Sequence, residues 1–214
     1  ATRKAQQLKV PLLTLSQKEL PPDKGDYVFQ NSLSPTDQIQ ILVTYVLKEM
    51  WLRTFAIFYP NSPYGSTFKN IFVREVARGG GKVVGAVAYS EEQTDFGKEI
   101  KAFFKIKTVK SEDSRKGAEE EFQAQLTVDV LFIPDTYNRA AMILSQMAYY
   151  NVGGVTFLGT NAWNHPDLIP TARKSAEGSI FVDAFFKDNP SPLVLRFVER
   201  FRKAYQRDPE TLDA

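Results

Sequence analysis

The chain has 214 residues, a formal net charge of +2, and ordinary fractions of hydrophobic (43%) and charged (24%) residues. This length suits one large domain or two small lobes, and the small charge gives no reason to expect nucleic acid as a partner. The absence of cysteine excludes disulfides, thiol catalysis and thiolate metal sites. A single histidine, His165, argues against a His-based catalytic triad or a multi-His metal site, so we expect neither an enzyme nor a cofactor.

The N-terminal part is predicted to contain short elements followed by one well-marked helix. Residues 1–9 resemble the last turns of a helix, 10–16 a strand, 20–26 a loop and 27–31 a short extended piece. A helix then begins at Ser34-Pro35-Thr36-Asp37, because Ser34 can cap it, Pro35 suits the first helical position and Asp37 complements the positive helix end. Its predicted buried face carries Ile39, Leu42, Val43, Val46, Leu47 and Met50.

The middle of the chain alternates between strands and helices. We predict a strand over 53–59, a turn over 60–65, a helix from about 66 to 78 that ends at three glycines, and a strand over 82–89. The glycines follow a helix rather than a strand, so they do not form a phosphate-binding loop. Thr94-Asp95 is expected to cap a helix running to about residue 106, and the charge-rich stretch 107–121 to be a solvated loop.

A predicted strand–helix–strand unit organises the remainder. Residues 128–135 and 155–161 are apolar runs that end in polar residues, and 137–150 between them reads as a helix. Such a unit has parallel strands and a right-handed crossover, and both sheet faces are covered by helices. Beyond it we expect a loop over 162–165, a short helix over 166–173, a strand or extended crossover over 179–186, and a helix over 192–205. This last helix is predicted to turn Val194, Leu195, Phe197, Val198 and Phe201 inward. The predicted fold class is therefore α/β, doubly wound, with mainly parallel sheets.

The order of several motifs resembles that of type I periplasmic solute-binding proteins, which include the leucine and branched-chain amino acid receptors of ABC importers. The similar segments are 10–16 (VPLLTLS), 27–29 (YVF), 55–60 (FAIFYP) with Tyr64-Gly65, Gly79-Gly80 before 83–85 (VVG), and 94–96 (TDF). Four later segments resemble the lipoprotein branch known as penicillin-binding protein activators: 131–135 (LFIPD), 158–163 (LGTNAW), 177–183 (EGSIFVD) and 197–201 (FVERF).

This resemblance implies two lobes. Residues 33–176 would form a nearly complete second lobe, and residues 1–32 with 177–214 a fragment of the first, since the chain is expected to be a piece lacking both ends. The implied function is non-catalytic binding of a small polar ligand, such as an amino acid or short peptide, between the lobes. The implied location is the periplasm or an outer-membrane lipoprotein, with an ABC-importer membrane component as partner. The alternative is an interaction domain that activates a penicillin-binding protein.

Five residues are the candidate ligand contacts. The resemblance implies that the hydroxyls of Thr14 and Ser16 hold a ligand carboxylate or amine and that Tyr64 packs on the ligand. Asn161 follows a parallel strand, where ligands of such sheets bind. Asp183 lies in the second crossover, where it either binds a ligand amine or fixes the hinge.

Each candidate also has a structural interpretation. Thr14 and Ser16 can bond a neighbouring turn, Tyr64 can cover a helix start, and Asn161 can bond its own loop. Two further residues at strand ends favour structural roles: Asp135 as a helix cap and Trp163 as a plug in the core.

Overall fold

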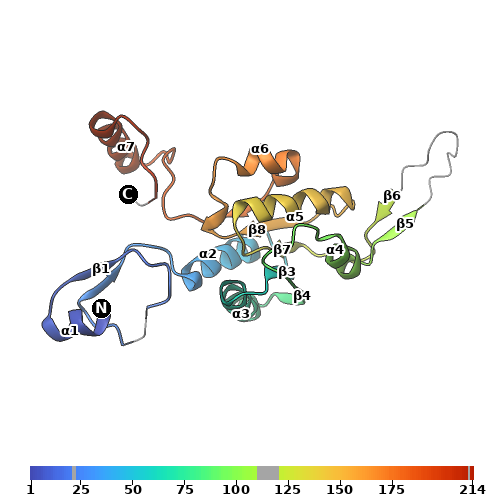
Figure 1. The fold of residues 1–214 in the computed structure, drawn as a ribbon, viewed down its shortest axis with the longest axis horizontal. Helices are drawn as coiled ribbons and strands as arrows, with labels where there is room; N and C mark the ends of the chain where they lie inside the picture. The colour runs from blue at the N-terminus through green and yellow to red at the C-terminus, as the bar shows by residue number, and fades with distance from the viewer. Residues whose placement is uncertain (21–22, 110–120, 212) are drawn as a thin grey trace. The chain divides into compact units, whose positions relative to one another are not determined.

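The computed structural model describes residues 1–20, 23–109, 121–211 and 213–214 (Figure 1). The chain divides into two compact units. Ala1–Gln38 and Asp183–Ala214 form one, called here the small unit, and Ile39–Val182 form the other, called here the sheet unit. Within the described residues, no helix is both long and apolar enough to cross a membrane.

The sheet unit is built on five parallel strands. They are β3 (Thr54–Pro60), β4 (Lys82–Tyr89), β7 (Val130–Phe132), β8 (Thr156–Gly159) and β9 (Ile180–Phe181), in the spatial order β4-β3-β7-β8-β9. After β3 the chain adds β4 on one side and then crosses to add β7 on the other. The sheet therefore has a topological switch point between β3 and β7, and the predicted doubly wound α/β class is confirmed.

Helices cover both faces of this sheet (Figure 1). The helices α2 (Pro35–Lys48) and α3 (Pro63–Arg78) lie on one side, while α5 (Tyr137–Tyr149) and α6 (Leu168–Ala172) lie on the other with α4 (Gly97–Phe104). On the α3 side, the rings of Phe72 and Phe132 stack with their centroids 4.4 Å apart. On the α4 side, the ring centroids of Phe58 and Phe104 lie 6.3 Å apart. Successive residues of a strand point to opposite faces of the sheet. Since helices cover both faces, the side chains that β3 and β7 direct to either face are apolar.

The helix after β3 begins earlier than predicted. Residues 60–65 do not form a turn, because α3 starts at Pro63, with Ser62 as its cap accepting a hydrogen bond from Gly65 N at 3.2 Å. Tyr64 therefore lies in the first helical turn. Gly65 permits this tight entry, since a side chain there would collide with the carbonyl oxygen of Pro60. The predicted start of α2 is confirmed, with Ser34 Oγ accepting from Asp37 N at 3.1 Å.

Other boundaries also differ from the prediction. Helix α4 ends at Phe104, with Lys105 in the left-handed conformation, and its cap position is Phe96, although Asp95 accepts a hydrogen bond from Gly97 N at 2.9 Å. Residues 161–163, predicted as part of a strand end and loop, form the 3-10 helix η1 (Asn161–Trp163). The short helix predicted over 166–173 is α6, and the 3-10 helix η2 (Arg173–Ala176) follows it.

The described ends of the charge-rich stretch 107–121 form strands instead of the predicted loop. Its ends pair as the antiparallel strands β5 (Lys107–Val109) and β6 (Glu121–Gln123), so the prediction is wrong for these residues, and 110–120 lie outside the described chain. The pairing is anchored by Phe122, which is buried and packs against Tyr149 and Tyr150 of the sheet unit. The burial of Phe122 thus stabilises this strand pair although the residues around it are mostly polar.

The small unit has little regular structure. It contains α1 (Thr2–Leu8), the parallel pair β1 (Leu12–Thr14) and β2 (Val28–Gln30), and α7 (Pro192–Tyr205). The bounds of α7 match the prediction, but of its predicted inward residues only Val198 is fully buried, and Leu195 is 52% exposed. Amphipathic spacing predicts the helix correctly; it does not ensure that another element covers the apolar face.

Asp129 joins the starts of β3 and β7. Its carboxylate Oδ2 accepts hydrogen bonds from the backbone N–H groups of Arg53 and Thr54, both at 2.8 Å, and its own N–H donates to Thr54 Oγ1 at 2.9 Å. Partial burial acts to raise the pKa of Asp129, but the hydrogen bonds from Arg53 and Thr54 outweigh it and hold the pKa below its usual range. These bonds to the ionised form therefore stabilise the β3–β7 pairing.

We predict that this stabilisation depends on pH. A carboxyl group with a depressed pKa in the folded protein contributes stability above its unfolded pKa of about 3.9 and loses it as pH falls through the folded value. Asp129→Asn should lower the free energy of unfolding by about 1–3 kcal/mol at neutral pH and flatten its decline below about pH 4. Urea denaturation at a series of pH values measures both effects. The exposed Glu49→Gln is the control, and an equal effect of both substitutions would contradict the role of Asp129.

Candidate ligand-binding site

The candidate site lies at the carboxyl ends of the sheet strands. The switch point places the residues after β3 beside those after β7, which is where ligands of open α/β sheets bind. Tyr64 follows β3, Tyr89 ends β4, Asp135 follows β7 and Thr160 follows β8. Hydrogen bonds connect these four residues into two neighbouring groups.

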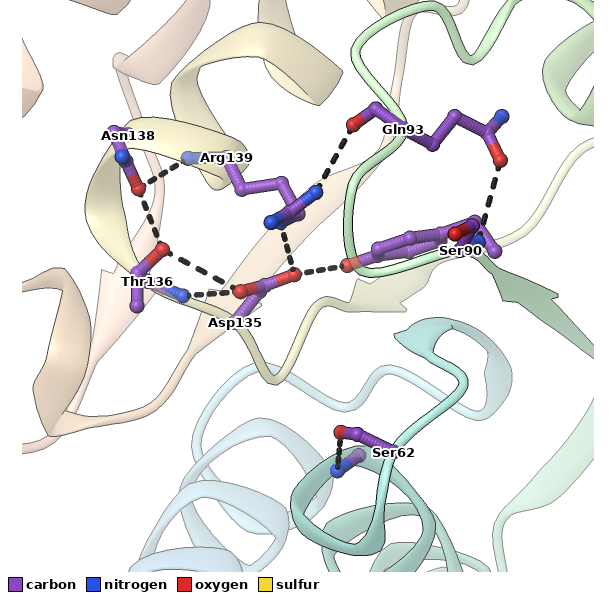
Figure 2. A network of polar contacts seen from close by, with 9 residues as sticks. Ser62, Ser90, Gln93, Asp135, Thr136, Asn138 and Arg139 are labelled. Atoms are coloured by element: carbon purple, nitrogen blue, oxygen red, sulfur yellow. Dashed lines mark hydrogen bonds and ion pairs between the residues drawn. The ribbon is translucent and has the colours of Figure 1, made fainter.

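Asp135 is the centre of the first group (Figure 2). Its Oδ1 accepts a hydrogen bond from Thr136 N at 2.7 Å, and its Oδ2 accepts one from Tyr89 OH at 2.8 Å and lies 3.0 Å from Arg139 Nε. The residue is only 7% exposed. It does not occupy the N-cap position predicted for it, which belongs to Thr136, but it does bond the backbone at the start of α5. A buried carboxylate needs such partners, because leaving it unpaired costs several kcal/mol.

Arg139 completes this group from the first turn of α5. Besides facing Asp135, its guanidinium donates from Nη1 to the carbonyl oxygen of Gln93 at 3.0 Å. The side chain is 24% exposed. The spacing of four residues between Asp135 and Arg139 suits such a pair across a helix start. Arg139 thus ties the loop after β4 to the helix after β7.

The second group consists of two hydroxyls. Tyr64 OH and Thr160 Oγ1 lie 3.1 Å apart and share a hydrogen bond, and Tyr64 packs on Phe68 with ring centroids 4.7 Å apart. Burial raises the pKa of Tyr64, and the charge of Asp135 raises it further, although the bond with Thr160 acts in the opposite direction. Burial followed by the charge of Asp135 also raises the pKa of Tyr89. Both phenols are therefore neutral at physiological pH.

The indole of Trp163 packs against the carboxyl end of β8. Its side chain is fully buried, as the structural interpretation predicts, and it lies against Gly159, where any side chain would collide with the indole. Thr160 caps η1 by accepting a hydrogen bond from Ala162 N at 3.3 Å. Packing of Trp163 therefore sets the position of the Thr160 hydroxyl.

A polar hollow of about 490 Å³ adjoins the network at the end of β4. It is lined by Asn61, Ala88, Tyr89, Ser90, Glu91, Glu92, Gln93 and Glu99. Gln93 connects the hollow to the network, since its carbonyl accepts from Arg139 while its side-chain amide donates to Glu99 Oε2 at 2.8 Å. Within the described part of the chain, no group of three or more His, Asp or Glu side chains could hold a metal ion.

The sequence-predicted residues fall in both units. Tyr64 and Asn161 lie in the sheet unit, and the bond between Tyr64 and Thr160 brings the two segments together. Thr14, Ser16 and Asp183 lie in the small unit. The roles of all five as ligand contacts stay predictions.

The hydroxyls and carboxylate of the small unit have local partners. Thr14 Oγ1 accepts from Ser16 N at 3.1 Å, Ser16 Oγ accepts from Lys18 N at 3.2 Å, and Asp183 Oδ1 accepts from Ala184 N at 2.6 Å. Thr211 Oγ1 also lies 3.2 Å from Asp183 Oδ2. These bonds match the turn-stabilising interpretation of Thr14 and Ser16.

Sequence reasoning missed Tyr89 and Arg139. Tyr89 appears in the sequence only as the last residue of a strand, and its side chain meets Asp135 through a contact between residues 46 positions apart. The four-residue spacing from Asp135 is a signal that could have identified Arg139, because the start of the helix was predicted at residue 137. Neither contact follows from the composition of its own segment.

A doubly wound parallel sheet with polar groups gathered at its switch point is an architecture that places ligands beyond the carboxyl ends of its strands, and it serves many unrelated functions. The sequence profile described as "Periplasmic binding protein" matches residues 1–214. The chain belongs to the periplasmic binding protein family, whose members are extracytoplasmic solute-binding receptors.

Solved structures share this fold at low sequence identity. A leucine-binding protein from Thermotoga maritima is 19% identical with a TM-score of 0.71, over 100% of this chain and 55% of that one. A branched-chain amino acid ABC transporter periplasmic ligand-binding protein from Burkholderia xenovorans is 15% identical with a TM-score of 0.74, over 100% and 52%. A solute-binding protein from R. palustris in complex with benzoate is 14% identical with a TM-score of 0.63, over 99% and 53%.

The chain thus spans about half the length of these structures. A search of the curated proteins found no match. These three structures are of solute-binding proteins, and none of the three specifically supports the penicillin-binding protein activator branch.

The packing of Trp163 generates one prediction. Gly159→Ala should displace the indole and the Thr160 hydroxyl and lower the free energy of unfolding by about 1–3 kcal/mol, because it overpacks a closed site. Gly153→Ala is the matched control, since a side chain there meets nothing within 4 Å. Urea denaturation and near-ultraviolet circular dichroism measure the two effects. Equal stability of the two variants would contradict this account.

A second prediction concerns the Asp135–Arg139 pair. Arg139→Gln should cost about 2 kcal/mol, because it leaves a buried carboxylate without its countercharge. The double variant D135N/R139Q should lose less than the sum of the two single changes, since it leaves no unpaired charge. A double-mutant cycle by urea denaturation measures this coupling. Strictly additive losses would show that the two side chains do not stabilise each other.

Proposed function

We propose that this chain is the ligand-binding portion of an extracytoplasmic, non-catalytic solute receptor of the ABC-importer type. Its ligand would be a small polar molecule. The observation that carries the proposal is the pair of neighbouring polar groups at the switch point of the parallel sheet, the Tyr64–Thr160 hydroxyls and the Asp135–Arg139 ion pair.

The comparisons support this class of function. The leucine-binding and branched-chain amino acid proteins bind amino acids, and the R. palustris protein binds benzoate, so this fold accepts small organic acids of different shapes. We propose that the sheet unit, Ile39–Val182, is one lobe of such a receptor. The small unit would belong to the other lobe, with Thr14, Ser16 and Asp183 as its contacts.

We also propose that the receptor works by closure. A ligand that binds the closed arrangement of two lobes more tightly shifts the population toward it, and a membrane component can then recognise the closed form. This role requires no catalytic group. It matches the single histidine and the absence of cysteine in the chain.

Ligand binding should raise the melting temperature of the chain. A ligand at 100 times its dissociation constant stabilises the folded state by about 2.7 kcal/mol, which corresponds to a shift of several degrees for a protein of this size. Thermal-shift screening against amino acids, short peptides and aromatic acids measures this effect. If no compound in the library raises the melting temperature, the proposal is rejected.

A matched pair of variants locates the site. Tyr64→Phe removes the hydroxyl shared with Thr160 and should weaken a saturable shift, whereas Tyr149→Phe should leave it unchanged. Tyr149 is 67% exposed at the carboxyl end of α5, on the same unit but away from the strand ends. Equal behaviour of the two variants would place the ligand elsewhere.

A further inference from the structure

A second hollow lies at the amino end of β3, opposite the candidate ligand-binding site. It is called here the α2–α3 hollow, has a volume of about 640 Å³, and is lined entirely by residues of the sheet unit. Along α2 its lining runs from Gln40 to Lys48, which corresponds to about 12 Å of helix. A groove of this length accommodates about four residues of an extended peptide.

Trp51 lines this hollow in a backbone conformation that favours glycine. Leu52 N donates to the carbonyl oxygen of Val46 at 3.1 Å, a bond typical of helix ends, so Trp51 occupies the position after α2 that most often carries glycine. Its φ is 60°, in the left-handed region, and the residue is 74% exposed. A bulky side chain is disfavoured in this conformation, and an exposed indole gains little from burial. Neither the helix end nor the core therefore explains a tryptophan here.

A buried ion cluster forms one wall of the hollow. Glu75 is 7% exposed, its Oε1 lies 2.9 Å from Arg74 Nε, and its Oε2 lies 3.2 Å from Arg78 Nη1. Burial acts to raise the pKa of Glu75, but the hydrogen bonds and charges of Arg74 and Arg78 outweigh it and hold the pKa below its usual range. The carboxylate is therefore ionised, and two guanidinium groups compensate its charge.

Two further cations at the hollow have no partner of their own. The side chains of Lys48 and Arg53 are exposed, and neither makes a hydrogen bond or an ion pair with any residue that the structure describes. The acids beside them are Glu49, which is adjacent to Lys48 in sequence, and Asp129, whose Oδ2 already accepts from the backbone N–H groups of Arg53 and Thr54. The hollow thus combines uncompensated positive charge with an exposed indole.

This combination favours an acidic partner that also carries an apolar side chain. Trp and Arg are among the residue types that dominate binding energy at protein interfaces, and a guanidinium pairs well with a carboxylate. An anionic membrane would also attract the charges. However, the buried side chains of Val43 and Leu47 line the hollow, and an extended peptide can reach them in a groove that a flat surface cannot enter. The shape therefore favours a peptide segment.

We propose that the α2–α3 hollow docks an acidic peptide segment of a protein partner. An apolar side chain of the segment would pack on Trp51, and its carboxylates would pair with Lys48 and Arg53. The proposal is independent of the proposed receptor function, because the hollow and the candidate ligand-binding site lie at opposite ends of the strands.

Two matched peptide pools test the proposal on the 214-residue chain. The acidic pool contains labelled pentapeptide amides with Asp or Glu at three positions and Leu or Phe at the other two, and the neutral pool has Asn or Gln in place of the acids. Fluorescence anisotropy measures affinity, which should be at least about tenfold lower for the neutral pool and should fall as salt is added. Unlabelled acidic peptides should protect Trp51 from acrylamide quenching, since the other tryptophan, Trp163, is already buried.

Trp51→Gly separates docking from folding. Glycine suits the left-handed conformation, so the melting temperature should not fall, whereas affinity for the acidic pool should drop at least about tenfold. A tryptophan that served the fold alone would give the opposite result, a lower melting temperature with unchanged affinity.

A matched pair of double variants assigns the charge effect. K48Q/R53Q should weaken binding of the acidic pool at least about fivefold. K98Q/K174Q removes the same charge from exposed lysines of α4 and η2 and should leave affinity unchanged.

Several outcomes would overturn the proposal. Equal binding of the two pools, no binding of either, or full affinity in Trp51→Gly or K48Q/R53Q would exclude an acidic segment at this hollow. Binding to phosphatidylglycerol vesicles but not to peptides would identify a membrane surface instead, and self-association in sedimentation that Trp51→Gly abolishes would identify a second copy of the chain. Acidic-pool binding that is lost in both hollow variants and kept in K98Q/K174Q supports the proposal.

Discussion

The adjacency of β3 and β7 is the constraint on which the rest of the sheet unit depends. It places a strand ending at residue 60 beside one ending at residue 132, and it creates the switch point at their carboxyl ends. At the amino ends, Asp129 binds the backbone of residues 53 and 54, and between the ends Phe72 stacks on Phe132. Without this pairing, the segments that carry Tyr64 and Asp135 would not lie side by side.

The electrostatics of the site follow from burial. A carboxylate at the end of β7 is enclosed by the loop after β4 and the start of α5, so it requires both Tyr89 and Arg139. With these partners in place, Asp135 has a structural role at the start of α5. Through Arg139, this ion pair also joins the start of α5 to the carbonyl of Gln93 in the loop after β4.

Sequence patterns predicted regular elements well and their contacts poorly. The bounds of β4 and α7 match the prediction, because apolar periodicity and a Ser-Pro start are local signals. The antiparallel pair β5–β6 was missed, since its stability comes from Phe122 packing against tyrosines of α5 and the residue after it rather than from its own composition. Leu195 was wrongly predicted to be buried, because spacing cannot show which element covers a helix face.

The sequence by itself determined the α/β class, the parallel order of the central unit and the position of polar residues after its strands, since these depend on hydrophobic period and turn chemistry within short segments. The tertiary structure alone decided which of those residues meet. It joined Tyr89 to Asp135 across 46 positions and Tyr64 to Thr160 across 96. Such contacts depend on strand order in the sheet, and no local pattern in the chain encodes that order.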